Sequence, residues 1–403
     1  MTQASEILGT RRTSSTRVVG VVSAAHFVSH IYILVLPPLF AFVRADYGVS
    51  YTELGLALAA YNIVSAALQT PAGFLVDWLG ARILLIAGLI VSAIAFAIAG
   101  LVDSFWVLVA MFALAGVGNT AFHPADYALL SHHVAPSRIG QAFSIHTFAG
   151  MLGSAVAPGG LLLMQSQWGW RGAFLGTAVL GFVVAAILAL QREEEPAHAP
   201  EAKPRAAKDN TPVGWRLLMA PAILLNMVFF IVLALISGGI NNYSIVALGA
   251  LYGTPQVTAS AALSAYLLLA AIGVLLGGVV VTHTTRHGAV TAFGLFATAV
   301  ATLLIAKFDF NSVMLILVMS VGGFFSGAIM PSRDMIVREV TPPGSFGKVF
   351  GFVSTGFNIG GVVSPLIFGA IMDHGSPRWV FLLVAAFNLI AIATVVTRPV
   401  RRD

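Results

Sequence analysis

GVGNTAFHPADY at residues 116–127 and GFFSGAIMPSRD at residues 323–334 begin two stretches of the chain that match at a constant offset of 207 residues. The match runs without a gap from Gly116 to Leu175 and from Gly323 to Leu382. It pairs identical residues at many positions: Ala121 and Ala328, Pro124 and Pro331, Gly140 and Gly347, Gly153 and Gly360, Pro158 and Pro365, Arg171 and Arg378. The repeat predicts that the chain consists of two related halves.

The composition indicates a protein that lies in a lipid bilayer. Of 403 residues, 58% are hydrophobic and only 9% are charged, whereas about 25% of the residues of a soluble domain are charged. The chain contains no Cys, which excludes disulfides, thiolate metal sites and a catalytic Cys. Its 40 Gly residues suit the close packing of membrane helices.

Twelve segments are apolar enough to span a bilayer, which takes roughly 20 residues of helix. Their approximate bounds are 18–43, 52–76, 82–101, 105–131, 140–164, 171–190, 216–248, 257–281, 289–306, 312–336, 347–372 and 378–397. Ser237-Gly238-Gly239 predicts a local break in the seventh segment. A second match, at an offset of 205 residues, pairs Tyr47 with Tyr252 and extends the repeat. The expected fold is therefore all-α, with 12 transmembrane helices in two six-helix bundles that form a parallel repeat.

The expected organisation is an N-terminal tail, a bundle, a polar linker, a second bundle and a C-terminal tail. These parts cover residues 1–17, 18–190, 191–215, 216–397 and 398–403. Sixteen of the 21 Lys and Arg residues fall on the side of the two termini, and four fall on the opposite side. This bias predicts an inner-membrane protein whose termini are both cytoplasmic.

GFLVDWLGAR at residues 73–82 resembles the loop 2–3 signature of the major facilitator superfamily. The matching residues are Gly73, Leu75, Asp77, Gly80 and Arg82. The resemblance implies a secondary transporter with a central cavity between two bundles that rock around it. It also implies that Asp77 and Arg82 help to latch the bundles on the inner side in one state.

Two further stretches resemble fosmidomycin-resistance-type members of that superfamily. They are GNTAFHPADYALL at residues 118–130 and GMLGSAVAP at residues 150–158. The second stretch also partly resembles an antiporter signature through Gly150, Gly153 and Pro158. These resemblances favour export over uptake.

Four histidines lie within predicted spans of the N-terminal half: His26, His30, His123 and His146. Helical spacing places His26 and His30 on one face. Because histidine titrates near neutral pH, the four are candidates for a proton or substrate site. The alternative is a set of separate histidines that hydrogen-bond between helices. Metal ligation is disfavoured because no carboxylate or Cys is expected beside them near the membrane midplane.

Other polar residues in the spans are candidates for substrate contact or for simple helix packing. Tyr61 and Tyr266 occupy equivalent places in the repeat, and Asn119 and Asn358 lie near the midplane. Three residues that follow the predicted break in the seventh segment could belong to an outer gate: Asn241, Asn242 and Tyr243.

Asp126 and Arg333 are repeat-equivalent residues of opposite charge. If they face each other across the symmetry axis, they form a salt bridge that shuts the inner gate. Three alternatives stay open: Arg333 pairs with its neighbour Asp334, both Asp126 and Arg333 reach cytoplasmic water, or Arg333 draws an anionic substrate into the inner vestibule.

The predicted function is proton-coupled export, by antiport, of a small organic compound. The alternative is proton-coupled uptake of a small organic solute or anion, and a remote alternative is a membrane sensor that transports nothing. No enzymatic, nucleic-acid-binding or Walker-type motif occurs. The sequence indicates no need for a cofactor or a metal, and a monomer suffices for this fold.

Overall fold

The computed structural model describes residues 2–135, 137–191, 215–342 and 345–396. Within these residues the chain is almost entirely helical and contains no strand. The first half contains α1 (Thr2–Ile33), η1 (Pro37–Leu39), α2 (Phe40–Tyr47), α3 (Tyr51–Leu79), α4 (Ala81–Leu101), α5 (Phe105–Asn119), α6 (Phe122–His133) and α7 (Ile139–Leu190). The second half contains α8 (Trp215–Leu218), α9 (Pro221–Gly238), η2 (Gly239–Tyr243), α10 (Ser244–Tyr252), α11 (Gln256–His283), α12 (His287–Lys307), α13 (Ser312–Ala328), α14 (Met330–Glu339), α15 (Phe346–Asp373) and α16 (Arg378–Val396).

Each of the twelve predicted segments coincides with a helix or with consecutive helices. In the described part of the chain, ten helical stretches are long and apolar enough to cross a membrane. One of them, α7, holds two predicted segments, which are separated where Gly169 adopts a φ of 72°. The predicted segment 52–76 coincides with α3, which is not among the ten. Helix α1 already begins at Thr2, so the predicted tail is helical. The predicted linker at 191–215 and the tail at 398–403 fall almost wholly outside the described residues.

Two prolines break the chain at equivalent places in the two halves. Helix α5 ends and α6 begins just before Pro124, and α13 ends and α14 begins just before Pro331. Proline has no N–H to donate to the carbonyl four residues earlier, so a regular helix is interrupted there. Each break lets the following short helix, α6 or α14, take its own direction.

The break predicted in the seventh segment is present as the π-helical turn η2. Tyr243 at its end is fully buried and donates a hydrogen bond to the Pro365 carbonyl oxygen at 2.7 Å. Its ring centroid lies 5.3 Å from that of Phe40 in the other half. The turn therefore contributes to the joint between the halves.

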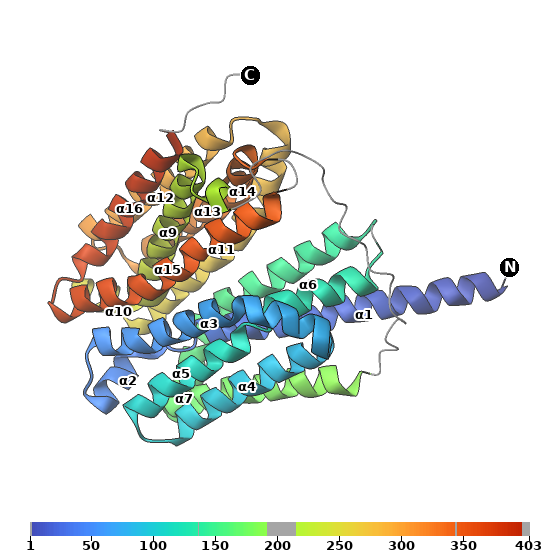
Figure 1. The fold of residues 1–403 in the computed structure, drawn as a ribbon. Helices are drawn as coiled ribbons and strands as arrows, with labels where there is room; N and C mark the ends of the chain where they lie inside the picture. The colour runs from blue at the N-terminus through green and yellow to red at the C-terminus, as the bar shows by residue number, and fades with distance from the viewer. Residues whose placement is uncertain (1, 136, 192–214, 343–344, 397–403) are drawn as a thin grey trace.

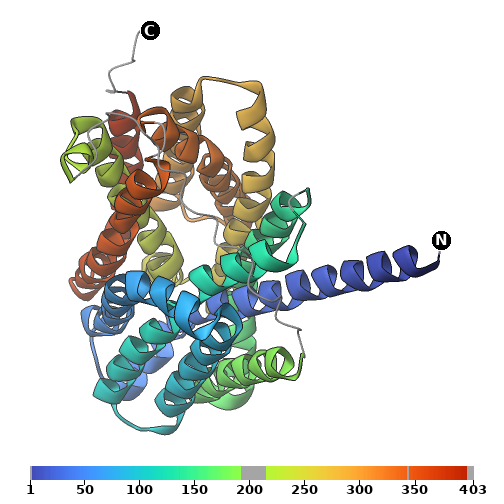
Figure 2. The same ribbon diagram turned by 45° about the vertical axis from the view of Figure 1, so that its right-hand side comes forward.

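The two halves form two bundles that meet at one end and diverge at the other (Figures 1 and 2). We call the end that carries α2 and α10 the closed end, and the end that carries α6 and α14 the open end. Helix α3 packs on α15, and α7 packs on α11, across the joint. Among the described residues, the hydrogen bonds between bundles come from Tyr51 and Thr52 to Asp373, from Asn62 to Gly361 and from Gln256 to Pro38.

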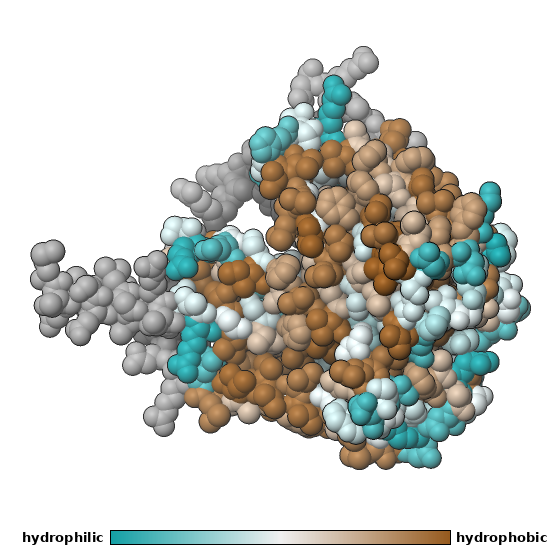
Figure 3. Space-filling model, turned by 180° about the vertical axis from the view of Figure 1, so that it is seen from behind, coloured by the Kyte–Doolittle hydropathy of each residue, from teal (hydrophilic) through white to brown (hydrophobic). Residues whose placement is uncertain are grey.

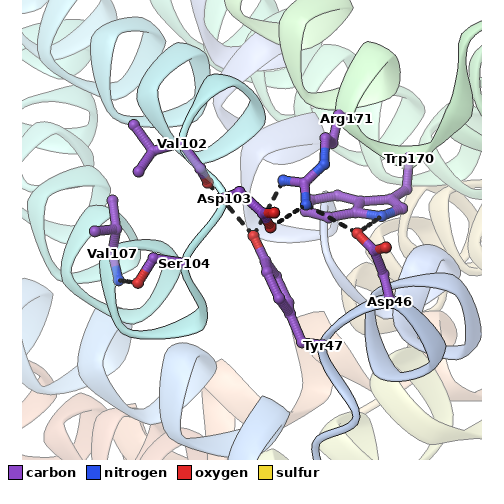
Figure 4. A network of polar contacts seen from close by, with 8 residues as sticks. All are labelled: Asp46, Tyr47, Val102, Asp103, Ser104, Val107, Trp170 and Arg171. Carbon is purple, nitrogen blue, oxygen red and sulfur yellow. Dashed lines mark hydrogen bonds and ion pairs between the residues drawn. The ribbon is translucent and has the colours of Figure 1, made fainter.

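The closed end of the N-terminal bundle is tied by a network around Arg171 (Figure 4). Its Nη2 lies 2.9 Å from Asp46 Oδ2 and 2.6 Å from Asp103 Oδ1. Its Nη1 donates to the Tyr47 hydroxyl, and its guanidinium stacks on the Trp170 ring at 4.3 Å. Because Arg171 follows the break at Gly169, the network fixes where α7 turns back.

The outer surface is largely apolar, as expected for helices that face lipid. Hydrophobic side chains cover most of the face in Figure 3, and hydrophilic ones gather along its edges. Large exposed apolar side chains include Phe74, Trp78, Leu163, Val257 and Val313. The polar residues of interest therefore lie inside the bundles or between them.

Candidate functional site

The four predicted histidines come together in the N-terminal bundle. The ring of His26 stacks on that of His146, with centroids 3.9 Å apart. It lies 4.7 Å from the ring of His30 and 5.4 Å from that of His123. The residues come from α1, α6 and α7, so the contacts depend on tertiary packing.

Asp126 completes this group. Its side chain is fully buried, and its Oδ2 lies 3.4 Å from His26 Nδ1 and 3.7 Å from His146 Nε2. We call His26, His30, His123, Asp126 and His146 the histidine cluster. The prediction had placed Asp126 at the gate instead. The spacing of His123 and Asp126, three residues apart on one helix face, could have indicated their common site.

Two small residues let α1 and α7 approach closely enough to form the cluster. A Cβ atom on Gly150 would lie 2.5 Å from His26 Cδ2 and 2.8 Å from His30 Nε2. A Cβ atom on Gly153 would overlap the carbonyl oxygen of Phe27. Farther along α7, Pro158 is buried within the helix. The small residues of the predicted antiporter-like motif thus make room for the histidines.

The side chains of the cluster differ in how much they are exposed. His123 is exposed, His30 is partly buried, and His26, Asp126 and His146 are buried. His30 Nδ1 lies 2.9 Å from Ser154 Oγ, which orients its ring. Several polar atoms of the buried members have no hydrogen-bond partner among the described residues: His26 Nδ1, both oxygens of Asp126 and both ring nitrogens of His146. Of these atoms, His26 Nδ1 and His146 Nε2 lie 3.4 and 3.7 Å from Asp126 Oδ2, close enough for ion-pair contact but without the geometry of a hydrogen bond.

The same three buried residues have donor atoms that could approach a metal ion. One atom each from His26, Asp126 and His146 lies within 4.8 Å of the others. The expectation that no carboxylate joins the histidines was therefore wrong. However, the two imidazole planes are only 25° from parallel, and the lone pairs of imidazole lie in the ring plane. Both rings could bind one ion only after one of them turned.

The salt bridge predicted between Asp126 and Arg333 is absent from this arrangement. Arg333 instead contacts Asp334, with Nη2 and Nε each 2.8 Å from Asp334 Oδ1. This corresponds to the alternative in which Arg333 pairs with its neighbour Asp334. The bundles diverge at this end, and each side chain has found a partner within its own bundle.

The other predicted contact residues lie apart from the histidine cluster. Asn119 donates to Ser65 Oγ at 3.2 Å, which joins α5 to α3. Tyr61 and Tyr266 are buried where α3 meets α5 and where α11 meets α13. Asn358 is partly buried on α15. A residue that the sequence did not single out, Asn62, donates to the Gly361 carbonyl oxygen across the bundles at 3.2 Å.

The loop 2–3 motif covers the end of α3 and the start of α4, and a single residue, Gly80, forms the turn between them. Gly80 adopts a φ of 89° between α3 and α4, a conformation that favours glycine. Arg82 donates to the Leu188 and Ala189 carbonyl oxygens and to that of Gln191. It therefore caps the C-terminus of α7. Asp77 is exposed, and in this arrangement the motif holds one bundle together rather than latching two.

Known proteins resemble the chain over nearly its whole length. The "Probable sulfoacetate transporter SauU" of Cupriavidus necator is 26% identical, over 95% of this chain and 93% of that protein. The "Fosmidomycin resistance protein" of Escherichia coli is 23% identical, over 96% of this chain and 94% of that protein. The fold matches an inward-facing, unoccupied bacterial homolog of the human lysosomal transporter Spinster. That match has a TM-score of 0.79 at 16% identity and covers 95% of this chain and 96% of the other.

The family model described as Major Facilitator Superfamily matches residues 22–256 and 229–403. These two matches together include both bundles and the motif at residues 73–82. The chain therefore belongs to the major facilitator superfamily of membrane transporters.

Proposed function

We propose that the protein is a proton-coupled secondary transporter in which the histidine cluster carries the proton. The observation that supports this most strongly is the fully buried Asp126 carboxyl group between two buried histidines. Isolated negative charge is costly at such a site. One proton shared among Asp126, His26 and His146 neutralises it.

The exposure of the cluster supplies a route for that proton. His123 is exposed, and its ring neighbours that of His26, which contacts Asp126. The facing titratable groups are His26 and His30 on α1, His123 and Asp126 on α6, with Tyr127 beside them, and His146 on α7. A proton that enters at His123 can therefore reach the buried carboxyl group by short steps.

The charge bias supports cytoplasmic termini, so we propose that the open end faces the cytoplasm. The structure then corresponds to an inward-facing state. In alternating access, the bundle at residues 18–190 rocks against the bundle at residues 216–397. The contacts of Asp373, Asn62 and Gln256 at the closed end must break when the outer side opens.

For direction, we propose export of a small organic compound in exchange for protons. The resistance protein among the relatives and the motif at residues 150–158 support this direction. The alternative is proton-coupled uptake, which the sulfoacetate transporter supports. Imposed pH gradients of opposite sign distinguish the two. Antiport accumulates substrate against its gradient on the side from which protons leave, and symport accumulates it on the side to which protons move.

The test begins with a thermal-shift screen for ligands of the purified protein, because a ligand raises apparent stability by mass action. Counterflow of each hit is then measured in proteoliposomes from pH 5 to pH 9. We expect His26→Gln and His123→Gln to shift or flatten the pH profile. The exposed His283→Gln on α11 serves as the control. A pH profile that both cluster variants share with the wild type would remove the histidines as proton carriers.

A further inference from the structure

The C-terminal bundle contains a second polar site, centred on Arg333. The guanidinium packs against a pair of touching aromatic rings, 5.0 Å from the Phe230 centroid and 5.4 Å from that of Phe357, whose own centroids are 4.9 Å apart. Cation–π contacts of this kind hold the planar group in one orientation. In the described part of the chain, its Nε and Nη2 both contact a single oxygen of Asp334, and no acceptor contacts Nη1.

Arg333 lines a small pocket that runs into the bundle. Ser237, Ser326 and Phe357 lie near its exposed side, and Thr298 and Asn388 are buried at its inner side. The cavity volume is about 40 Å³, whereas roughly 10–15 Å³ is enough to hold one water. The pocket therefore has room for a compact chemical group.

The polar lining defines the chemistry of that group. A guanidinium with a free edge binds carboxylate, sulfonate or phosphonate oxygens through charge-assisted hydrogen bonds. Asn388 is fully buried, and its Oδ1 has no hydrogen-bond partner among the described residues. A buried acceptor without a partner is unfavourable, so a hydroxyl or amino hydrogen on the ligand would satisfy it.

Asp334 is placed to compete with such a ligand. Its side chain is 43% exposed, whereas that of Arg333 is 13% exposed. The carboxylate can therefore turn into water when another anion reaches the guanidinium. In the structure it holds Nε and Nη2 of the guanidinium, and its negative charge opposes an anion at the neighbouring Nη1.

We propose that this pocket binds the anionic group of the transported compound, and that the compound is a small organic anion that also carries a hydroxyl or amino group. The inference rests on the proposed transport function and names its substrate class. It assigns the anion to the C-terminal bundle, while the proton is assigned to the N-terminal bundle.

The test uses calorimetric titration of the purified full-length protein in detergent. The probes are 2-hydroxyethanesulfonate, ethanesulfonate, which lacks the hydroxyl, and the neutral ethyl methyl sulfone. We expect the first to bind most tightly, the second more weakly and the third not at all. Arg333→Gln should raise the Kd by about 10-fold or more, as expected for loss of a charge-assisted hydrogen bond.

Asp334→Asn is the decisive variant, because removal of a competitor should lower the Kd by about threefold or more. A purely structural Arg333–Asp334 pair predicts that both variants bind more weakly. Arg333→Lys, which keeps the charge, covers the case in which Arg333→Gln fails to fold. Arg338→Gln is the control, since Arg338 lies on the same helix, is exposed and does not line the pocket.

Three results would overturn the proposal: no binding of either anion to the wild type, equal binding of the neutral sulfone, or weaker binding by Asp334→Asn. Binding is measured without a pH gradient. Failure of the histidine cluster to carry protons would therefore leave this result unchanged, and failure of the pocket would leave the pH profile of transport unchanged.

Discussion

The two bundles place opposite chemistry at the same positions of the repeat. His123 and Asp126 on α6 correspond to Met330 and Arg333 on α14. In the first bundle the acidic side chain is buried against two histidines. In the second bundle the basic side chain packs against a pair of phenylalanine rings and lines a pocket.

One further position shows how a shared backbone supports this difference. Gly150 on α7 corresponds to Phe357 on α15. The glycine leaves space for His26 and His30 from α1, whereas the phenylalanine fills the equivalent space and stacks on Arg333. The comparison teaches how a few side chains give equivalent positions opposite chemistry, and the two proposals assign the proton to one bundle and the anion to the other.

The largest expected effect comes from Asp126→Asn. Asparagine cannot take up a proton at this position, so proton-driven transport should fall by about 100-fold or more, as is typical for loss of a positioned proton-transfer group. Anion binding at the other bundle should stay within about twofold of the wild type, because distant sites are nearly independent. Flux in proteoliposomes measures proton-driven transport, and calorimetric titration measures anion binding.

Arg333→Gln is the matched partner of that variant. It should lose anion binding but keep proton release and uptake at the histidine cluster, as measured with a pH-sensitive dye in lightly buffered solution. If either variant abolished both activities, the division between the bundles would be wrong.

The second prediction concerns the glycine that admits the histidines. Gly150→Ala should lower the free energy of unfolding by about 1–3 kcal/mol, because the added methyl group would overlap the ring of His26. Gly140→Ala is the control on the same helix, since a Cβ there meets nothing within 4 Å. Thermal melts of both variants in one detergent provide the measurement. Equal stability of the two would show that the close approach of α1 and α7 is not required.

A smaller effect is expected at the closed end, where the halves also differ. The N-terminus of α3 donates three hydrogen bonds to Asp373, including one from Thr52 Oγ1 at 2.6 Å. The repeat-equivalent Gln256 donates a single side-chain bond to the Pro38 carbonyl oxygen. Asp373→Asn should therefore weaken the closed end by about 1 kcal/mol, which shifts an opening equilibrium by roughly five- to tenfold.

Distances between spin labels on α2 and α10 measure that shift. Asp309→Asn, an exposed acid at the same end, serves as the control. Gln256→Ala should change the distances less than Asp373→Asn. A larger change from Gln256→Ala than from Asp373→Asn would mean that the bond from Gln256 to Pro38 stabilises the closed end more than the bonds to Asp373 do.

The sequence predicted the parts of this molecule that depend on local patterns. Apolar runs located every segment, and Ser237-Gly238-Gly239 located the π-helical turn. The repeat equated Asp126 with Arg333 correctly, but equivalence in a repeat does not determine which neighbour a side chain contacts. Asp126 contacts His26 on α1, which lies outside the stretches that match between the halves.

The same limit applies to Arg333. Its setting depends on Phe230 from α9 and Phe357 from α15, whose proximity is a matter of packing and has no signature along the chain. A pocket likewise depends on how five or more helices fit together. Periodicity indicates which residues are apolar, but not where side chains leave space between them.

The smallest expected effect is the coupling between Asp126 and Arg333 themselves. Each has a partner in its own bundle, so a double-mutant cycle of Asp126→Asn and Arg333→Gln should give a coupling energy below about 0.5 kcal/mol in the free energy of unfolding. Transport should show the same independence, with the two losses multiplying. A coupling of 1 kcal/mol or more would mean that the residues meet in another state and shut the inner gate. The opposite charges would then serve to join the bundles, and the assignment of the proton to one bundle and the anion to the other would have to be abandoned.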